Sequence, residues 1–267
     1  MWMRLKLGRN RMTYLNFSGK KYIVFGASSG IGRQTALQLS QLGAKVVLVG
    51  RNEGRLQQTY AMLDGEGHKI FICDVSNFSE AQNIVKNAVS FDGVKLDGCV
   101  FSAGVYSMIP IGMVTEEKIY KVFATNIVSF MAIAKTFSSK RISNNGASFV
   151  SVSSRAATLP DKSQGVYGAS KAAINSYTFA ASKEMSNRQI RFNAVCPEAV
   201  DTEMGAGFKA NTSNEDMKKI YPLGMLESED VADAIIFLLS DMSKKITGQS
   251  IWLSAGNDGG SIESSIF

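Results

Sequence analysis

The sequence predicts one α/β domain, built on a doubly wound parallel sheet of about seven strands with helices on both faces. Short continuous apolar runs alternate with amphipathic segments, which is typical of strands that helices cover on both sides. No linker rich in Pro or Ser and no internal repeat interrupts this alternation. With 267 residues, of which 45% are hydrophobic and 19% charged, the chain is long enough to bury one large core.

Strands and helices are expected in alternation from residue 22 onward. The predicted strands cover residues 22–25, 45–49, 69–73, 96–101, 147–152, 191–195 and 250–253. The predicted helices cover residues 31–42, 53–63, 79–89, 116–139, a segment around Tyr167 that ends near Asn187, and 229–239. Gly43 is expected to end the first helix, because glycine readily takes the left-handed conformation that closes a helix.

The formal net charge of +6 comes from the N-terminal end of the chain. Its first 21 residues hold six basic residues and no acidic one, namely Arg4, Lys6, Arg9, Arg11, Lys20 and Lys21. Without them the chain has 23 basic and 23 acidic residues, so the body of the protein is neutral. We therefore expect no nucleic-acid partner.

Residues 1–19 form a basic extension that is expected to be disordered. They lack the apolar core and the small-residue cleavage site of a secretory signal. Two alternatives are a weak contact with an anionic surface and a true start at Met12. No apolar run approaches the length of a membrane span, so we expect a cytoplasmic protein with its domain over residues 20–256 and a C-terminal tail over residues 257–267.

The cysteines and the single histidine do not indicate a metal or disulfide site. Cys73, Cys99 and Cys196 lie far apart in apolar runs, and no pair has metal-binding or redox spacing. Small buried residues in a reducing compartment are the expectation. His68 is the only histidine, and we expect it to be structural and partly exposed, with no metal bound.

A glycine-rich turn follows the first predicted strand and opens the first predicted helix. It reads Gly26-Ala-Ser-Ser-Gly-Ile-Gly32, and glycines permit a tight turn and a close approach of backbone to phosphate. The helix N-terminus adds unpaired N–H groups and a positive dipole end, which favour a pyrophosphate. The turn therefore predicts a dinucleotide site that includes Gly26, Ser28, Ser29, Gly30, Ile31 and Gly32.

The end of the second strand indicates which dinucleotide is bound. An acid here would accept a hydrogen bond from the ribose 2′-hydroxyl of NAD, but the chain has Arg51 instead. An arginine can form a fork with a 2′-phosphate, so NADP(H) is the predicted cofactor. The alternative is an exposed arginine without a ligand. Arg33 would add positive potential, and Asp74, next to Val75, would contact the adenine or cap a helix.

Tyr167 and Lys171 lie four residues apart in a predicted helix and so share one face of it. A free phenol has a pKa near 10, too high for acid–base catalysis at neutral pH. A fixed ammonium group beside it is expected to lower that pKa. Taken alone the pair is a common accident of helix surfaces, and it gains weight only from the rest of the chain.

Seven motifs in order make the chain resemble a short-chain dehydrogenase/reductase of the common single-domain type, over about residues 20–256. They are Gly26-x-x-x-Gly30-x-Gly32, Ala103-Gly104, Asn126, Ser154, Tyr167-x-x-x-Lys171, Asn193-Ala-Val-Cys-Pro197 with Thr202, and Ile246-Thr-Gly-Gln249. The resemblance implies a Rossmann-type fold and an NADP(H)-dependent interconversion of a ketone and a secondary alcohol. The similarity extends to 3-oxoacyl-(acyl-carrier-protein) reductases.

The resemblance also implies a role for each matching residue. Tyr167 would exchange the proton, Lys171 would lower the phenol pKa and hold the nicotinamide ribose, and Ser154 would orient the substrate oxygen, with Ser153 as the neighbouring candidate. Asn126 would place a water in a proton relay, or would be a buried bridge at a helix irregularity. Thr202 would contact the cofactor or cap a helix, and the cofactor set also includes Val75, Ala103, Gly104, Pro197 and Val200.

Four positions depart from the common pattern of this family. Phe25 precedes Gly26, Ser102 precedes Ala103, and Glu198 follows Pro197. Ser254 lies a few residues after the Ile246-Thr-Gly-Gln249 motif. Phe25 and Ser102 are expected on adjacent strands, where the two departures could compensate for each other in side-chain packing.

Residues 198–222 are expected to form a mobile substrate lid with apolar contacts from Met204, Phe208, Met217, Ile220 and Tyr221, or an amphipathic surface helix. Met108, Ile109 and Pro110 would form the opposite wall. By resemblance the substrate is a 3-oxoacyl thioester, with a sugar, polyol or steroid ketone as alternatives. Arg188 falls at one expected carrier-docking position, and Asn145 occupies the other.

Family members are usually tetramers, so a homotetramer or homodimer packed through the Asn126 and Tyr167 helices is expected by resemblance. A protein of another class, a regulator or scaffold that binds NADP without turnover, remains an alternative. It is disfavoured because Asn126, Ser154, Tyr167 and Lys171 are all present.

Overall fold

Seven parallel strands form the central sheet of this computed structural model, which describes residues 15–203 and 213–257. The strands are β1 (Lys21–Phe25), β2 (Lys45–Gly50), β3 (Lys69–Ile72), β4 (Leu96–Phe101), β5 (Ser143–Val152), β6 (Arg191–Pro197) and β9 (Ser250–Leu253), in the order β3-β2-β1-β4-β5-β6-β9. The predicted doubly wound sheet is confirmed.

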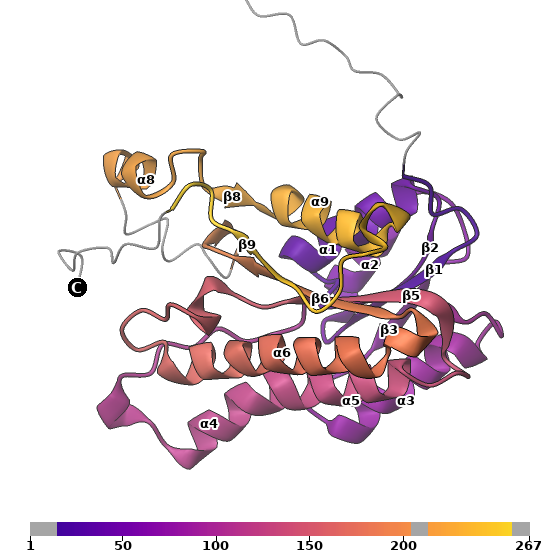
Figure 1. Cartoon of the computed structure of the whole chain (residues 1–267), viewed down its shortest axis with the longest axis horizontal. Coiled ribbons are helices and arrows are strands. Elements are labelled where there is room, and N and C mark those ends of the chain that lie inside the picture. The colour runs from indigo at the N-terminus through magenta and orange to yellow at the C-terminus, as the bar shows by residue number, and fades with distance from the viewer. Residues whose placement is uncertain (1–14, 204–212, 258–267) are drawn as a thin grey trace, which may run out of the picture.

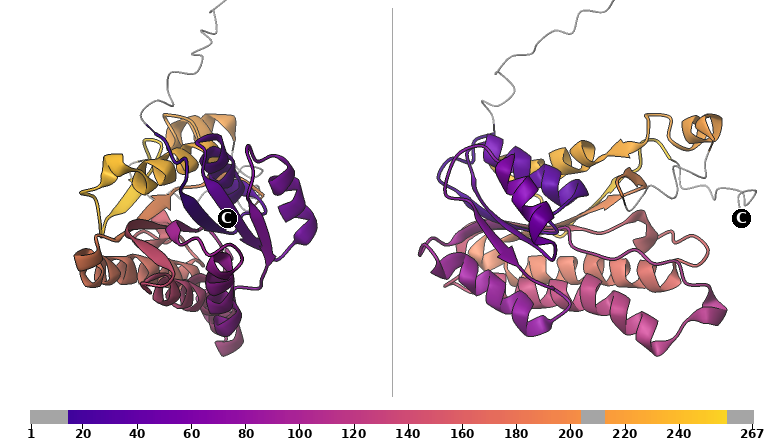
Figure 2. Two further views of the ribbon diagram at one scale, coloured as in Figure 1. Left: turned by 90° about the vertical axis from the view of Figure 1, so that its right-hand side faces the viewer. Right: turned by 180° about the vertical axis from the view of Figure 1, so that it is seen from behind.

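Helices cover both faces of this sheet (Figures 1 and 2). One layer contains α1 (Gly30–Gln41), α2 (Glu53–Ala61) and α9 (Ser228–Leu239), and the other contains α3 (Phe78–Ser90), α4 (Glu116–Phe123), α5 (Ser129–Phe137) and α6 (Gly165–Glu184). The short helix α8 (Asn214–Ile220) follows β6 outside these layers. Over the described residues, none of the helices combines the length and apolar character needed to cross a membrane.

Successive strand residues point to opposite faces and so feed two separate cores. Ile23 packs with Phe101 and Phe149 under α3, α5 and α6, whereas its neighbour Val24 packs with Leu48 under α1 and α9. All five residues of β1 are buried. Burial on both faces explains why the strands are continuous apolar runs rather than alternating ones.

Three segments differ from the sequence-based expectation. The helix predicted over residues 116–139 is divided by a π-helical turn, Ala124–Val128, between α4 and α5. A short strand in the predicted lid region, β7 (Val200–Asp201), pairs with β8 (Leu226–Glu227) just beyond that region, and no sequence pattern indicated either strand. The predicted boundary at residue 19 is wrong, because Phe17 is buried and packs edge-on against Tyr22 at 5.2 Å.

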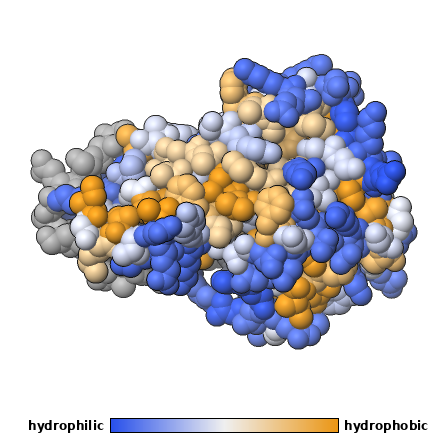
Figure 3. Space-filling view, turned by 90° about the horizontal axis from the view of Figure 1, so that it is seen from below, coloured by the Kyte–Doolittle hydropathy of each residue, from blue (hydrophilic) through white to orange (hydrophobic). Residues whose placement is uncertain are grey.

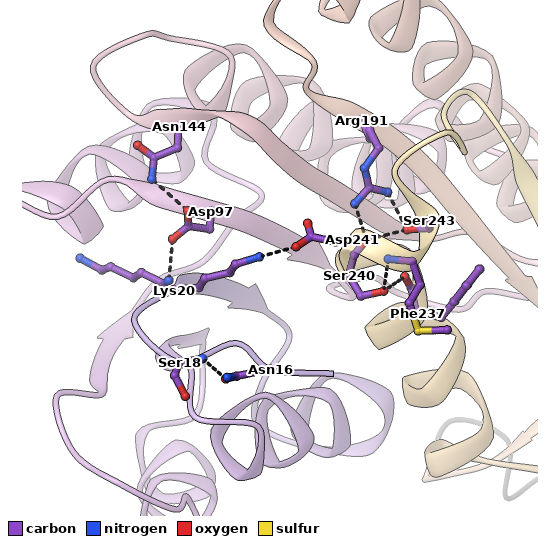
Figure 4. A network of polar contacts seen from close by, with 12 residues as sticks. Asn16, Ser18, Lys20, Asp97, Asn144, Arg191, Phe237, Ser240, Asp241 and Ser243 are labelled. Carbon is purple, nitrogen blue, oxygen red and sulfur yellow. Dashed lines mark hydrogen bonds and ion pairs between the residues drawn. The ribbon is translucent and has the colours of Figure 1, made fainter. Parts of the chain in front are cut away.

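Polar contacts tie the amino ends of the strands together (Figure 4). At the start of β4, Asp97 accepts hydrogen bonds from the backbone of Lys21 (2.9 Å) and from Asn144 (2.9 Å). The buried guanidinium of Arg191 at the start of β6 donates to the backbone oxygens of Leu238 (2.6 Å) and Ser240 (3.1 Å) at the C-terminal end of α9. These contacts stabilise the edge opposite the one at which the strands end.

We predict that Gly32→Ala destabilises the fold, because a Cβ at position 32 would collide with the carbonyl oxygen of Gly26. Overpacking of this kind costs about 1–3 kcal/mol, measurable as the free energy of unfolding in urea. Gly112→Ala is the matched control, since nothing lies within 4 Å of a Cβ there. Equal stability of the two variants would contradict the close approach.

Candidate active site

A cleft of about 1510 Å³ opens at the carboxyl ends of the parallel strands. Its wall includes residues that end or directly follow five strands: Gly26, Gly50, Cys73, Ser102 and Pro197. The strand order reverses between β1 and β4, and there Gly26 approaches the next loop so closely that a Cβ would lie 2.8 Å from the backbone nitrogen of Ala103. Ligands of doubly wound sheets bind at this switch point.

The glycine-rich turn presents the N-terminus of α1 to the cleft. Gly26 and Gly30 take positive φ angles of 81° and 51°, which favour glycine. Ser29 lies at the N-cap position but makes no side-chain capping hydrogen bond, and the first turn of α1 contains no acid. The first N–H groups of α1 are therefore available to an anion, as a pyrophosphate requires. Ser28, Ser29, Gly30 and Ile31 line the cleft, and Gly32 is buried behind them.

Arg51 lies at the end of β2 and lines the cleft. Among the described residues it makes no hydrogen bond or ion pair, whereas its neighbour Arg55 is paired with Glu203 at 2.8 Å. Arg33 is turned away from this role, because it donates to the backbone oxygen of Ser28 (2.5 Å) and to Thr59 (2.9 Å). These contacts therefore do not support the expectation that Arg33 adds positive electrostatic potential to the cofactor site.

Asp74 begins a turn rather than capping a helix. Its carboxylate accepts from the backbone nitrogen of Ser76 (3.0 Å), and Asn77 is the N-cap of α3. Partial burial raises the pKa of Asp74, but the hydrogen bonds from Ser76 and the charge of Arg51 outweigh burial and hold this pKa below its usual value. Cys73 and Val75, on either side of it, line the cleft.

Tyr167, Ser154 and Lys171 meet at the centre of the cleft. Ser154 lies at the Tyr167 phenol and lowers its pKa, whereas the hydroxyl of Ser153 donates to the backbone oxygen of Lys171 at 3.1 Å. Of the two neighbouring serines, Ser154 is thus the one at the phenol. The Nζ of Lys171 donates to the backbone oxygen of Val152 (2.9 Å) and lies 5.7 Å from the centre of the Tyr167 ring.

Burial dominates the acid–base properties of this pair. It raises the pKa of Tyr167 to about 12, although the neighbouring Ser154 opposes the shift. Burial lowers the pKa of Lys171 to about 8. The predicted lowering of the phenol pKa by Lys171 is not seen here: burial is the largest cause of the shift, and the group that opposes it is Ser154.

Asn126 is fully buried in the π-helical turn. Its amide oxygen accepts from the backbone nitrogen of Val105 (2.8 Å), and its amide nitrogen donates to the backbone oxygen of Val105 (3.0 Å) and to Ser170 (3.0 Å). A Cβ on Gly104 would lie 3.3 Å from the Asn126 oxygen and 3.4 Å from the Lys171 Nζ. Asn126 therefore bridges the loop after β4, the π turn and α6.

The remaining predicted cofactor residues also line the cleft: Ala103, Gly104, Pro197, Val200 and Thr202. Of the predicted substrate walls, Met108 lines it, as does Tyr221 from the lid region, while Met204 and Phe208 lie outside the described residues. Sequence reasoning missed Tyr106, which packs edge-on against Tyr167 at 5.1 Å, and Gln164, which donates to the Tyr106 hydroxyl at 3.0 Å. Their position next to Tyr167 depends on loop geometry that no local pattern encodes.

Comparison with known proteins identifies the family. Residues 26–258 match the family described as enoyl-(acyl carrier protein) reductase. The chain belongs to the short-chain dehydrogenase/reductase family. Carbonyl reductase family member 4 of Danio rerio is 34% identical over 88% of this chain and 96% of its own length, and L-xylulose reductase of Caenorhabditis elegans is 32% identical over 90% and 96%.

A bacterial relative and a solved structure agree with this assignment. The 3-oxoacyl-(acyl-carrier-protein) reductase FabG of Rickettsia felis is 31% identical over 91% of this chain and 98% of its own length. A short-chain type dehydrogenase/reductase from Mycobacterium ulcerans superposes with a TM-score of 0.84 at 31% identity, over 91% of this chain and 90% of that one. The chain is thus an oxidoreductase of a family that binds a nicotinamide cofactor.

His68 and Arg188 lie away from the cleft and have structural contacts. His68 is buried, not partly exposed as expected, and its ring nitrogens contact the backbone of Val46 (3.0 Å) and Asp64 (2.9 Å). Arg188 donates to the Asn145 side chain (3.1 Å) and to the backbone oxygens of Ser138 and Ser143 (both 2.7 Å). The three cysteines are buried thiols, as predicted.

The lowered pKa of Lys171 predicts how stability depends on pH. Between its folded value of about 8 and the ordinary lysine value of 10.5, the unfolded chain binds more protons than the folded one. The free energy of unfolding of the wild type should therefore rise with pH in this window relative to Lys171→Met, and the difference should be constant below it. Urea denaturation at about pH 7, 8.5 and 9.5 measures this.

Lys183→Met, which removes an exposed lysine from the same helix, is the control for that titration. A flat difference between wild type and Lys171→Met across the window would show that Lys171 keeps an ordinary pKa in the folded protein.

Proposed function

We propose that this protein is an NADP(H)-dependent oxidoreductase that interconverts a ketone and a secondary alcohol, with Tyr167 as the acid and base. The observation that carries the proposal is the contact of Ser154 with the Tyr167 phenol, beside Lys171, in the cleft that the glycine-rich turn opens. An anion-binding helix end and a proton donor in one cleft are what reduction of a carbonyl needs.

The cofactor would lie along the ends of β1, β2 and β4, with its pyrophosphate at the N-terminus of α1. Arg51 supports the choice of NADP(H), since among the described residues its guanidinium makes no hydrogen bond or ion pair and is near only the charge of Asp74, and such an arginine in the cleft wall matches a 2′-phosphate. Val75, Ala103 and Gly104 would contact the adenine and ribose side, and Pro197, Val200 and Thr202 the nicotinamide side. Bound NADPH would supply the hydride.

In this proposal the residues of the chain orient the carbonyl and deliver its proton. Ser154 donates a hydrogen bond to the substrate oxygen, and Tyr167 transfers its proton to that oxygen as negative charge develops there. Lys171 then stabilises the phenolate and, through the family's relay, returns a proton. Asn126 fixes the position of Lys171 through Gly104 and Ser170. We also propose that Asn126 takes part in the proton relay.

We also propose which segment covers the substrate and how copies of the chain assemble. Residues 198–222 would act as a substrate lid, and a homotetramer or homodimer would form through the α4–α5 and α6 surface. That surface carries apolar patches (Figure 3), and its exposed apolar side chains include Tyr120, Val128 and Phe179. A cytoplasmic location completes the proposal. The candidate substrates are a 3-oxoacyl thioester and a sugar, polyol or steroid ketone.

We predict that Arg51→Ala weakens NADPH binding by about 10–100-fold, because a charge-assisted hydrogen bond to phosphate contributes about 1.5–3 kcal/mol. NADH affinity should stay within about twofold. Titration followed by protein fluorescence measures both dissociation constants. Arg141→Ala, which removes an exposed arginine elsewhere, is the control, and an unchanged NADPH affinity in Arg51→Ala would refute the 2′-phosphate assignment.

Tyr167→Phe should lower kcat for ketone reduction by about 10²–10⁴-fold, since it removes the proton donor and leaves the ring in place. NADPH affinity should be retained, which separates loss of chemistry from loss of the cofactor site. Undiminished turnover in this variant would overturn the proposed mechanism. Normal NADPH binding with no turnover of any ketone by the wild type would favour a non-enzymatic regulator or scaffold.

A further inference from the structure

A buried ion pair lines the cleft beside two proposed site residues. Glu198 follows Pro197 at the end of β6, and Arg155 follows Ser154 at the end of β5. The Nε of Arg155 lies 2.8 Å from the Glu198 carboxylate, and both side chains are about nine-tenths buried, with exposures of 10% and 9%. Both residues line the cleft.

Neighbouring elements hold this pair in place. Arg155 also contacts Asp161 at 3.2 Å, and the backbone nitrogen of Asp161 donates to Gln164 at 3.0 Å. Tyr221, buried at the end of the lid region, lies against the same group, and the charge of Glu198 adds to burial in raising the pKa of Tyr221 to about 12. Arg155 and Glu198, which follow Ser154 and Pro197 in the chain, thus belong to one fixed polar cluster.

The pair is held but is not internally satisfied. The Arg155 Nε is buried and makes no well-aligned hydrogen bond, even though the carboxylate is near. Burial raises the pKa of Glu198, and the charge of Arg155 opposes the shift. A buried ion pair is weak evidence for stability, because desolvation offsets much of the attraction. Binding of a ligand by the Arg155–Glu198 pair would explain why the pair lies in the wall of the cleft.

We propose that the Arg155–Glu198 pair selects ketones that carry hydroxyl groups close to the carbonyl. This inference rests on the proposed function. A hydrocarbon chain laid against the cluster would strip water from it and return no hydrogen bond, which is costly. Hydroxyl groups replace that water by donating to the Glu198 and Asp161 carboxylates. A site with fixed polar groups discriminates strongly against the analogue that lacks the hydroxyls.

The apolar lining of the cleft suits the same class of substrate. Tyr106 and Met108 also line the cleft, and Gln164 connects Tyr106 to Asp161 of the same cluster, so their apolar surface can pack against the C–H groups of a short polyhydroxylated chain. The carrier-protein alternative has less support, because the Arg188 guanidinium is already bound to Asn145, Ser138 and Ser143. Among the candidate substrates, a sugar or polyol ketone is therefore the one that the described residues favour.

The test compares a five-carbon ketose with 2-pentanone, which has the same carbon chain without the hydroxyls, and with a 3-oxobutyryl thioester. NADPH oxidation gives kcat and KM for each. The wild type should favour the ketose over 2-pentanone by at least about 10²-fold in kcat/KM. Glu198→Gln should reduce this ratio at least about tenfold, mainly through KM for the ketose. Glu184→Gln, an exposed acid far from the cleft, is the matched control.

Several outcomes would overturn the inference. These are a wild-type preference for 2-pentanone or the thioester, and a ketose preference that Glu198→Gln leaves unchanged. A change common to all three substrates would show that the pair only supports the lid.

Calorimetry of the wild-type protein with NADP⁺ and each ketone tests binding without turnover and without a variant. Tighter binding of the ketose than of 2-pentanone supports the inference even if reduction fails, and equal binding refutes it. Reduction of none of the three ketones would count against the proposed function separately.

Discussion

The site depends first on the side-chain amide of Asn126, which pairs with both backbone groups of Val105 and with Ser170. These three bonds join the loop after β4, the π-helical turn and α6. A buried amide is costly unless its hydrogen bonds are made, so the three elements are held in one arrangement. Gly104 leaves room between Asn126 and Lys171 that a Cβ would fill, and the lysine amine is held by its hydrogen bond to the backbone oxygen of Val152.

Burial is the second constraint, and it acts in opposite directions on the two central groups. It disfavours the charged form of each, so it raises the pKa of Tyr167 to about 12 and lowers that of Lys171 to about 8. The two values start at 10.0 and 10.5 and move apart, so proton transfer from the phenol to the amine costs more in this cleft than in water. Ligands that bring polar groups into the cleft would change this balance, so in our account acid–base function is completed by binding.

Sequence patterns predicted the sheet and most of the site because these features are local or periodic. Continuous apolar runs located all seven strands, and the glycine spacing located the turn that opens α1. The π-helical turn at Asn126 was foreseen only as an alternative, a buried asparagine at a helix irregularity, since an i→i+5 pattern has no composition of its own. The contact of Arg155 with Glu198, 43 positions apart in the chain, was also beyond the sequence, although Glu198 was noticed as a departure from the family.

The contacts are consistent with the choice of Ser154 over its neighbour Ser153, since Ser154 lies at the phenol and Ser153 donates to the backbone of Lys171. The central claim is that this cleft transfers hydride to a carbonyl that Tyr167 protonates. Deuterium transfer from NADPH labelled at the nicotinamide C4, on either face, tests it most directly, with a ketone panel analysed by mass spectrometry. The account predicts deuterium at the carbinol carbon with the wild type and none above background with Tyr167→Phe. Cofactor binding without label in any alcohol, or equal labelling by the two proteins, would contradict it.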